Sequence, residues 1–170
     1  MVKTTRTMEV SGSIVVETDP ETAYDAVSDV TQMGRWSPEN TGAVVAEPGR
    51  PAYPGMTFVG SNRRGPMRWH TECTVTVADR PSRFVFQVRR FGLWKPMLTV
   101  AVATWEYRFD AVAGGTRVTE IWYDDRARWP DTPTLWFDRV ATGQRGFAEF
   151  QQGNIRRTLE RLKAELENAR

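Results

Sequence analysis

A single stripe of residues at helical spacing runs through the C-terminal part of the chain and constrains the fold more than any other feature. Successive members lie three or four residues apart, which predicts that they share one face of a long helix. The stripe consists of Phe137, Ala141, Gln144, Ala148, Gln151, Ile155, Leu159, Leu162 and Leu166. Its second half is aliphatic, whereas its first half carries small and amide side chains. We therefore expect the second half to pack tightly and the first half to cover a cavity.

Two glycines beside this stripe, Gly143 and Gly146, lower the helix propensity of the segment. A break or bend between them is therefore predicted. The helix is expected to follow a proline-containing loop, with Thr132 as its cap and Pro133 in its first position.

The hydrophobic pattern ahead of this helix predicts mostly strands. Residues 9–18 alternate apolar and polar side chains, which is typical of a half-buried strand. Asp19 as N-cap and Pro20 in the first turn predict a helix directly afterwards, and a second short helix is expected near residues 31–33. Further strands are expected at residues 43–47, 56–63, 70–78, 83–90, 98–110 and 116–125.

This order predicts an α+β fold in one domain across residues 1–170. A curved antiparallel sheet has one face to cover, and the C-terminal helix is the only element large enough to cover it. We therefore expect a sheet of about six to seven strands wrapped around that helix, with the two short helices after the first strand.

Composition excludes several classes of function. The 23 basic and 21 acidic residues nearly cancel and are dispersed, so no nucleic-acid partner is expected. A single cysteine, Cys73, excludes an internal disulfide and a cysteine-rich metal site. The chain shows no signal peptide and no apolar run of membrane-spanning length, so a cytoplasmic protein without integral membrane association is expected. No metal, cofactor or phosphate-binding loop is predicted, and the oligomeric state is left open.

The one histidine, His70, offers little chemistry. It lies three residues from Cys73 on a predicted strand, so the two side chains point to opposite faces and cannot share a metal ion. No serine has the surroundings of a catalytic nucleophile.

Strand alternation predicts which residues face the cavity. The inward set comprises Trp69, Cys73, Val75, Val77, Phe84, Phe86, Val88, Ala101, Ala103, Trp105, Tyr107 and Phe109. Glycines at 114 and 115 predict a hairpin that pairs Val112 with Gly115. In that register Phe109 faces Val118, Tyr107 faces Glu120, and Trp105 faces Trp122.

Glu120 is the exceptional member, because it places a carboxylate on the buried face. An unpaired buried charge is costly and either neutralises or finds a partner. One interpretation is a group that orients a ligand or acts as a general base, which makes Glu120 and Tyr107 the candidate catalytic residues. The other is a structural carboxylate tied to Tyr107, Arg90 or a backbone donor.

Other candidates also have two interpretations. Trp36 stands at the cavity entrance or plugs the short helices against the sheet. Gln144 and Gln151 donate amide hydrogen bonds to a ligand or face solvent. Arg63 and Arg64 recognise an anionic group or simply end a solvated strand.

Local sequences in this order resemble the polyketide cyclase/dehydrase and lipid-transport branch of the START-like (SRPBCC) superfamily, which has the birch-pollen-allergen fold. The matching stretches are Asp19-Pro20-Glu21 followed by Ala26-Val27-Ser28-Asp29, Arg35-Trp36-Ser37-Pro38-Glu39, Asn62-Arg63-Arg64-Gly65, Arg68-Trp69, Cys73-Thr74-Val75, Thr104-Trp105-Glu106-Tyr107, Gly115-Thr116-Arg117-Val118-Thr119-Glu120 and Arg157-Thr158-Leu159-Glu160-Arg161-Leu162-Lys163. The resemblance spans nearly the whole chain and implies a helix-grip fold with a small hydrophobic ligand of lipid, polyketide or isoprenoid type. No catalytic signature of an aromatase/cyclase maps onto these residues.

The first functional hypothesis is thus a binder of such a ligand, held in a cavity between the sheet and the C-terminal helix. The expected cavity residues are Trp36, Trp69, Cys73, Phe86, Trp105, Tyr107, Glu120, Trp122, Gln144, Ala148 and Gln151. The alternatives are a polyketide cyclase/dehydratase-type enzyme that uses Glu120 and Tyr107, and a regulatory or interaction module without a ligand.

Overall fold

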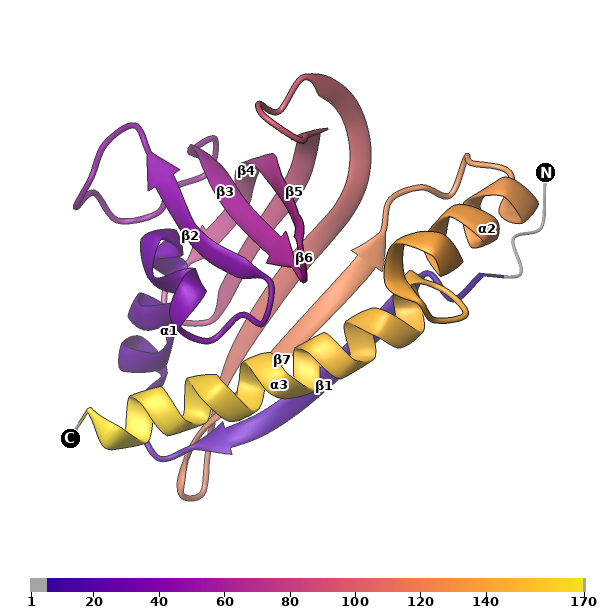
Figure 1. Cartoon of the computed structure of the whole chain (residues 1–170). Helices are drawn as coiled ribbons and strands as arrows, with labels where there is room; N and C mark the ends of the chain where they lie inside the picture. The colour runs from indigo at the N-terminus through magenta and orange to yellow at the C-terminus, as the bar shows by residue number, and fades with distance from the viewer. Residues whose placement is uncertain (1–5, 170) are drawn as a thin grey trace.

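A seven-stranded antiparallel sheet wraps around the C-terminal helix in the computed structural model, which describes residues 6–169 (Figure 1). The strands are β1 (Glu9–Val16), β2 (Asn40–Val45), β3 (Thr57–Arg64), β4 (Met67–Asp79), β5 (Arg83–Gly92), β6 (Leu98–Val112) and β7 (Gly115–Asp124). Their order in the sheet is β1-β7-β6-β5-β4-β3-β2, so β2 to β7 form a continuous meander and β1 pairs with the last strand. The predicted fold class is confirmed.

The helices are α1 (Pro20–Ser28), the 3-10 helix η1 (Val30–Arg35), α2 (Asp131–Thr142) and α3 (Phe147–Asn168). The concave side of the sheet is covered by α1, η1 and α3, whereas α2 packs against α3. Asp19 caps α1 as predicted, because its carboxylate accepts the Thr22 backbone N–H at 2.8 Å. No helix among residues 6–169 combines the length and apolar character needed to cross a bilayer.

The predicted break in the C-terminal helix is confirmed. Gly143 ends α2 in the left-handed conformation, with φ of 70°, and Gly146 precedes α3. The predicted start is wrong, since α2 begins at Asp131 and no side chain caps it. Thr132 is already inside the helix, while the Asp131 carboxylate accepts a hydrogen bond from Arg6.

The predicted hairpin register is confirmed. Val112 pairs with Gly115, and the pairs Phe109–Val118, Tyr107–Glu120 and Trp105–Trp122 follow. Two predictions from simple alternation are wrong. An irregularity in β4 puts Val77 opposite Val85 instead of Phe84, and Ala101 is exposed beside a second irregularity between β5 and β6. An extra residue in a strand shifts every following side chain to the other face, which alternation alone cannot show.

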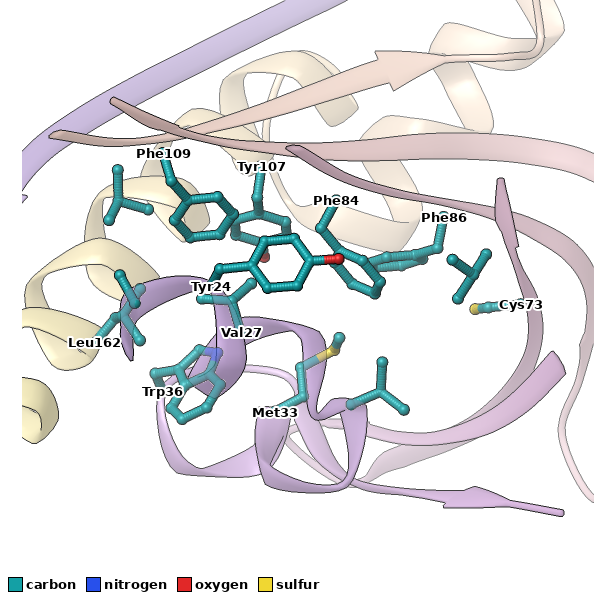
Figure 2. Close-up of a cluster of buried hydrophobic side chains, with 14 of the residues drawn as sticks. Tyr24, Val27, Met33, Trp36, Cys73, Phe84, Phe86, Tyr107, Phe109 and Leu162 are labelled. Carbon is teal, nitrogen blue, oxygen red and sulfur yellow. The ribbon is translucent and has the colours of Figure 1, made fainter. Parts of the chain in front are cut away.

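Aromatic side chains fill the concave face where α1 and η1 cover it. Figure 2 shows this cluster, which includes Tyr24, Met33, Trp36, Phe84, Phe86, Phe109 and Leu162. Trp36 is only 2% exposed, so it plugs η1 against the sheet and does not stand at an entrance. At the β1 edge of the sheet, α3 packs closely on β1, because Gly12 has no side chain. A Cβ there would lie 2.9 Å from Ile155 Cγ2.

Candidate functional site

Tyr107 and Glu120 form a buried pair on the concave face of the sheet. They lie directly opposite each other on β6 and β7, and Gly12 of β1 is the neighbour of Glu120 on the other side. The Tyr107 hydroxyl donates to Glu120 Oε1 at 2.7 Å, and the two residues are 4% and 2% exposed. The predicted tie to Tyr107 is therefore present. Arg90 is instead 3.6 Å from the carboxylate of Glu72.

The second carboxyl oxygen of Glu120 has no hydrogen-bond partner among residues 6–169. Burial raises the pKa of Glu120 to about 8, although the hydrogen bond from Tyr107 acts in the opposite direction. At neutral pH the carboxyl group is therefore mostly protonated. Because Oε1 accepts from Tyr107, the proton belongs on Oε2, and the pair presents an unused hydrogen-bond donor.

Tyr107 is the fixed member of the pair. Burial and the neighbouring Glu120 raise the pKa of its phenol well above the usual value, so it keeps its proton. It cannot serve as a base at ordinary pH. Its hydroxyl orients Glu120, and this leaves Glu120 as the group able to donate or exchange a proton.

The other predicted cavity residues differ in their burial and in their place on the sheet. Cys73, Phe86 and Trp122 are buried in the cluster that contains Tyr107 and Trp36, while Trp105 and Ala148 are half-buried and pack against it. Trp69 is half-buried at the β3–β4 end of the sheet, where its ring lies 5.4 Å from the Arg64 guanidinium. Burial raises the pKa of Cys73 to about 12, so its thiol is unreactive.

Gln144 and Gln151 do not act together as predicted. Gln144 is exposed in the turn between α2 and α3, so its predicted place on one helix face with Gln151 is wrong. The helical stripe assumes an unbroken helix, and the Gly143–Gly146 turn rotates Gln144 out of it. Phe137, on α2, is also exposed, at 52%. Gln151 is buried, and its Oε1 accepts from Asn154 at 3.2 Å.

A polar cluster that was not predicted connects β3 to α3. Arg64 donates to Glu39 Oε1 at 2.7 Å and to the carbonyl oxygen of Ala141 at 2.6 Å. Glu39 Oε2 in turn accepts from Asn154 at 2.9 Å. The Arg64 guanidinium also lies over the Phe150 ring, 4.0 Å from its centroid.

This cluster overturns both interpretations of Arg64. Its guanidinium is committed to Glu39 and so is not free for an anionic ligand, and its half-buried side chain does not end a solvated strand. Burial raises the pKa of Glu39, although the charge of Arg64 opposes the shift. The neighbouring Arg63 is exposed. Asn154 follows Gln151 by three residues and so lies on the same helix face. This spacing is the sequence signal that could have indicated its place in the polar cluster.

Two surface hollows lie away from this site. One, of about 510 Å³, runs between β1 and the outer side of α3, and the other, of about 520 Å³, lies beside the β6–β7 hairpin. Neither is lined by a predicted site residue. Among residues 6–169, no group of three His, Cys, Asp or Glu side chains is placed to hold a metal ion. His70 Nδ1 is 3.2 Å from Ser61 Oγ, and Cys73 lies in the core.

A curved antiparallel sheet that grips a long C-terminal helix places the protein in the class of helix-grip folds. Residues 7–167 match the family described as polyketide cyclase/dehydrase and lipid transport, and the chain belongs to this family. A search of curated proteins found no match.

Solved structures share the fold at low sequence identity. A START superfamily protein from Mycobacterium smegmatis is 12% identical with a TM-score of 0.69, covering 96% of this chain and 100% of that one. The polyketide-cyclase-like protein Cgl2372 from Corynebacterium glutamicum is 22% identical with a TM-score of 0.55, covering 98% and 93%. DynU16, from the dynemicin biosynthetic locus, is 15% identical with a TM-score of 0.61, covering 97% of this chain and 49% of that one. At these identities the likeness shows the fold alone.

Proposed function

We propose that this protein binds a small, mostly apolar ligand of lipid, polyketide or isoprenoid type between the concave face of the sheet and the C-terminal helix. The ligand would place a carbonyl or similar acceptor atom on the protonated carboxyl of Glu120. The observation that carries this proposal is that Glu120 Oε2 has no hydrogen-bond partner among residues 6–169, although Glu120 is only 2% exposed and its Oε1 is held by Tyr107.

The energetics support a ligand at this position. A buried polar group without a hydrogen-bond partner costs about 1–3 kcal/mol, and an apolar side chain at position 120 would avoid that cost. An acceptor atom of a bound ligand would recover it. The side chains around the pair are apolar or aromatic, including Trp105 and Trp122, so the remainder of the ligand would be apolar too.

A neutral ketone tests the role of Glu120 directly. The expected result is that 2-undecanone displaces the fluorescent probe N-phenyl-1-naphthylamine from the wild-type protein, with affinity reduced about tenfold or more in Glu120→Leu. Glu120→Gln should stay close to wild type at pH 7, because the amide nitrogen replaces the protonated oxygen as donor. Above pH 8 the wild type should lose affinity as Glu120 ionises, since its pKa is about 8, whereas Glu120→Gln should not.

Glu106→Gln serves as the matched control. Glu106 is also a buried carboxylate on β6, but it pairs with Arg83 and Arg108 on the other face of the sheet. Its substitution should leave ketone affinity unchanged. Equal affinity in the wild type and Glu120→Leu, or no displacement at all, would count against the proposal and favour a module without a ligand.

The protonated state of Glu120 also favours a second candidate, an enzyme that cyclises or dehydrates a poly-β-ketone. A neutral carboxyl fixed by a tyrosine could protonate the oxygen of a carbonyl under attack. An enzyme would show turnover in the wild type, and Glu120→Gln would bind substrate normally but lose that turnover. A simple binding protein would show no turnover in either.

A further inference from the structure

Large apolar side chains are exposed mainly at one end of the molecule. Eleven such residues are exposed among those described, and nine of them lie in three segments. These nine, the apolar rim, are Met67, Leu93, Trp94, Met97, Leu98, Trp129, Trp136, Phe137 and Val140. Trp94 is 90% exposed and Trp136 is 70% exposed. Two largely exposed indole rings are costly in water and call for an explanation.

The topology brings these three segments to the same end of the sheet. In an antiparallel meander, successive turns alternate between the two ends. The β3–β4 turn, the β5–β6 connection and the β7–α2 connection therefore share one end. The hydrogen bond from Arg64 to the Ala141 carbonyl oxygen ties the first of these to α2. Figure 1 shows the β5–β6 connection and α2 both projecting away from the β6–β7 hairpin, which lies at the opposite end.

The charge at this end is mostly positive. Within the described residues 63–68, 89–98 and 125–149, cations outnumber acids among the exposed ionisable side chains, and the acids are Asp125 and Glu149. The exposed cations are Arg63, Arg68, Arg89, Arg90, Lys95, Arg128, Arg139 and Arg145. The whole chain has a net charge of only +2. The other end carries exposed charges of both signs, with Glu17, Asp19, Glu21 and Asp79 beside Arg80 and Arg117.

From this combination we infer that the apolar rim docks onto the surface of an anionic lipid bilayer. Tryptophan side chains prefer the interface between headgroups and hydrocarbon, and neighbouring Lys and Arg side chains are attracted to anionic headgroups. Lys95 directly follows Trp94, and Arg139 lies one helical turn from Trp136.

A bilayer fits this surface better than a protein partner does. The cores of protein interfaces are depleted of charged residues, whereas here cations are interleaved with the exposed aromatic residues. The apolar side chains also stand on separate turns and a helix, which suits a flat and deformable surface. This docking does not depend on the ligand proposed above.

Vesicle flotation tests the inference. The protein should float with phosphatidylcholine vesicles that contain about 30% phosphatidylglycerol, because this anionic lipid gives the surface a strong negative charge. It should not float with vesicles of pure phosphatidylcholine, which lack that charge. Trp94→Glu should reduce the partition coefficient about tenfold or more, and Lys95→Ala about fivefold. Val44→Glu is the matched control, because Val44 is 72% exposed on β2 outside the rim, and it should bind vesicles like the wild type.

Three outcomes would overturn the inference. The first is an absence of flotation with anionic vesicles, and the second is an equal loss in Trp94→Glu and Val44→Glu. The third is that the wild type is a dimer by light scattering, that Trp94→Glu dissociates it, and that neither protein binds vesicles. This result would identify the apolar rim as a contact between two copies of the chain. Glu120→Leu should float normally, so failure of the ligand proposal and failure of docking are distinguishable.

Discussion

Glu120→Gln is expected to raise the free energy of unfolding by about 3 kcal/mol at pH 7 and to leave it nearly unchanged near pH 4. The pKa of Glu120 is about 8 in the folded protein, against 4.5 for an unperturbed glutamate. Between these values the unfolded chain has released the proton while the folded protein still holds it. Stability therefore falls as pH rises through this window, and a neutral glutamine removes the loss. Urea denaturation at several pH values measures the difference.

Glu106→Gln provides a control with the opposite sign. Burial alone would raise the pKa of Glu106, but its hydrogen bonds to Arg83 and Arg108 outweigh burial and lower the pKa. The stability that Glu106 contributes is therefore present at neutral pH and is lost as pH falls through its folded pKa. Glu106→Gln should destabilise the protein at pH 7 and matter less in acid. A pH-independent effect of Glu120→Gln would show that Glu120 is ionised in the folded protein.

The Tyr107–Glu120 pair could be predicted because its cause is local. Glycines at 114 and 115 define the hairpin, and the hairpin fixes the register of every pair above it. A one-residue slip would put Glu120 on the other face of the sheet. The alternation of apolar and polar residues in β6 and β7 therefore supports the same register that the hairpin predicts. The α1 cap at Asp19 and the break after Gly143 were predictable for the same reason.

The errors arose where distant segments decide the outcome. The strand irregularity that turns Val77 away depends on how β4 fits β5, and nothing in the local pattern marks it. Arg64 does end β3, but it is not solvated as expected, because its partners Glu39 and Ala141 come from distant parts of the chain. Gln144 lies outside the helical stripe because the chain turns after Gly143, and a helical period holds only within an unbroken helix.

Arg126→Met is expected to lower the free energy of unfolding by about 3–5 kcal/mol, because it breaks a buried ion network. Arg126 donates to Asp124 Oδ1 at 2.9 Å and to Asp138 Oδ1 at 2.7 Å, and all three side chains are less than 5% exposed. Burial alone would lower the pKa of Arg126, but the hydrogen bonds to Asp124 and Asp138 outweigh it and raise the pKa. Without the guanidinium, the Phe147 backbone N–H, at 3.3 Å, is the one donor to the Asp138 carboxylate left in the described part of the chain.

The network joins the end of β7 to α2 and to the start of α3, so its loss should release the segment that carries Trp136. Arg80→Met is the matched control, because Arg80 pairs with Asp25 on the surface, where an ion pair contributes little. Adding Asp138→Asn to Arg126→Met should recover part of the lost stability, because it removes the stranded charge. If Asp138→Asn instead added its own full cost to that of Arg126→Met, the penalty would reflect lost packing of the arginine side chain and not an unpaired buried carboxylate.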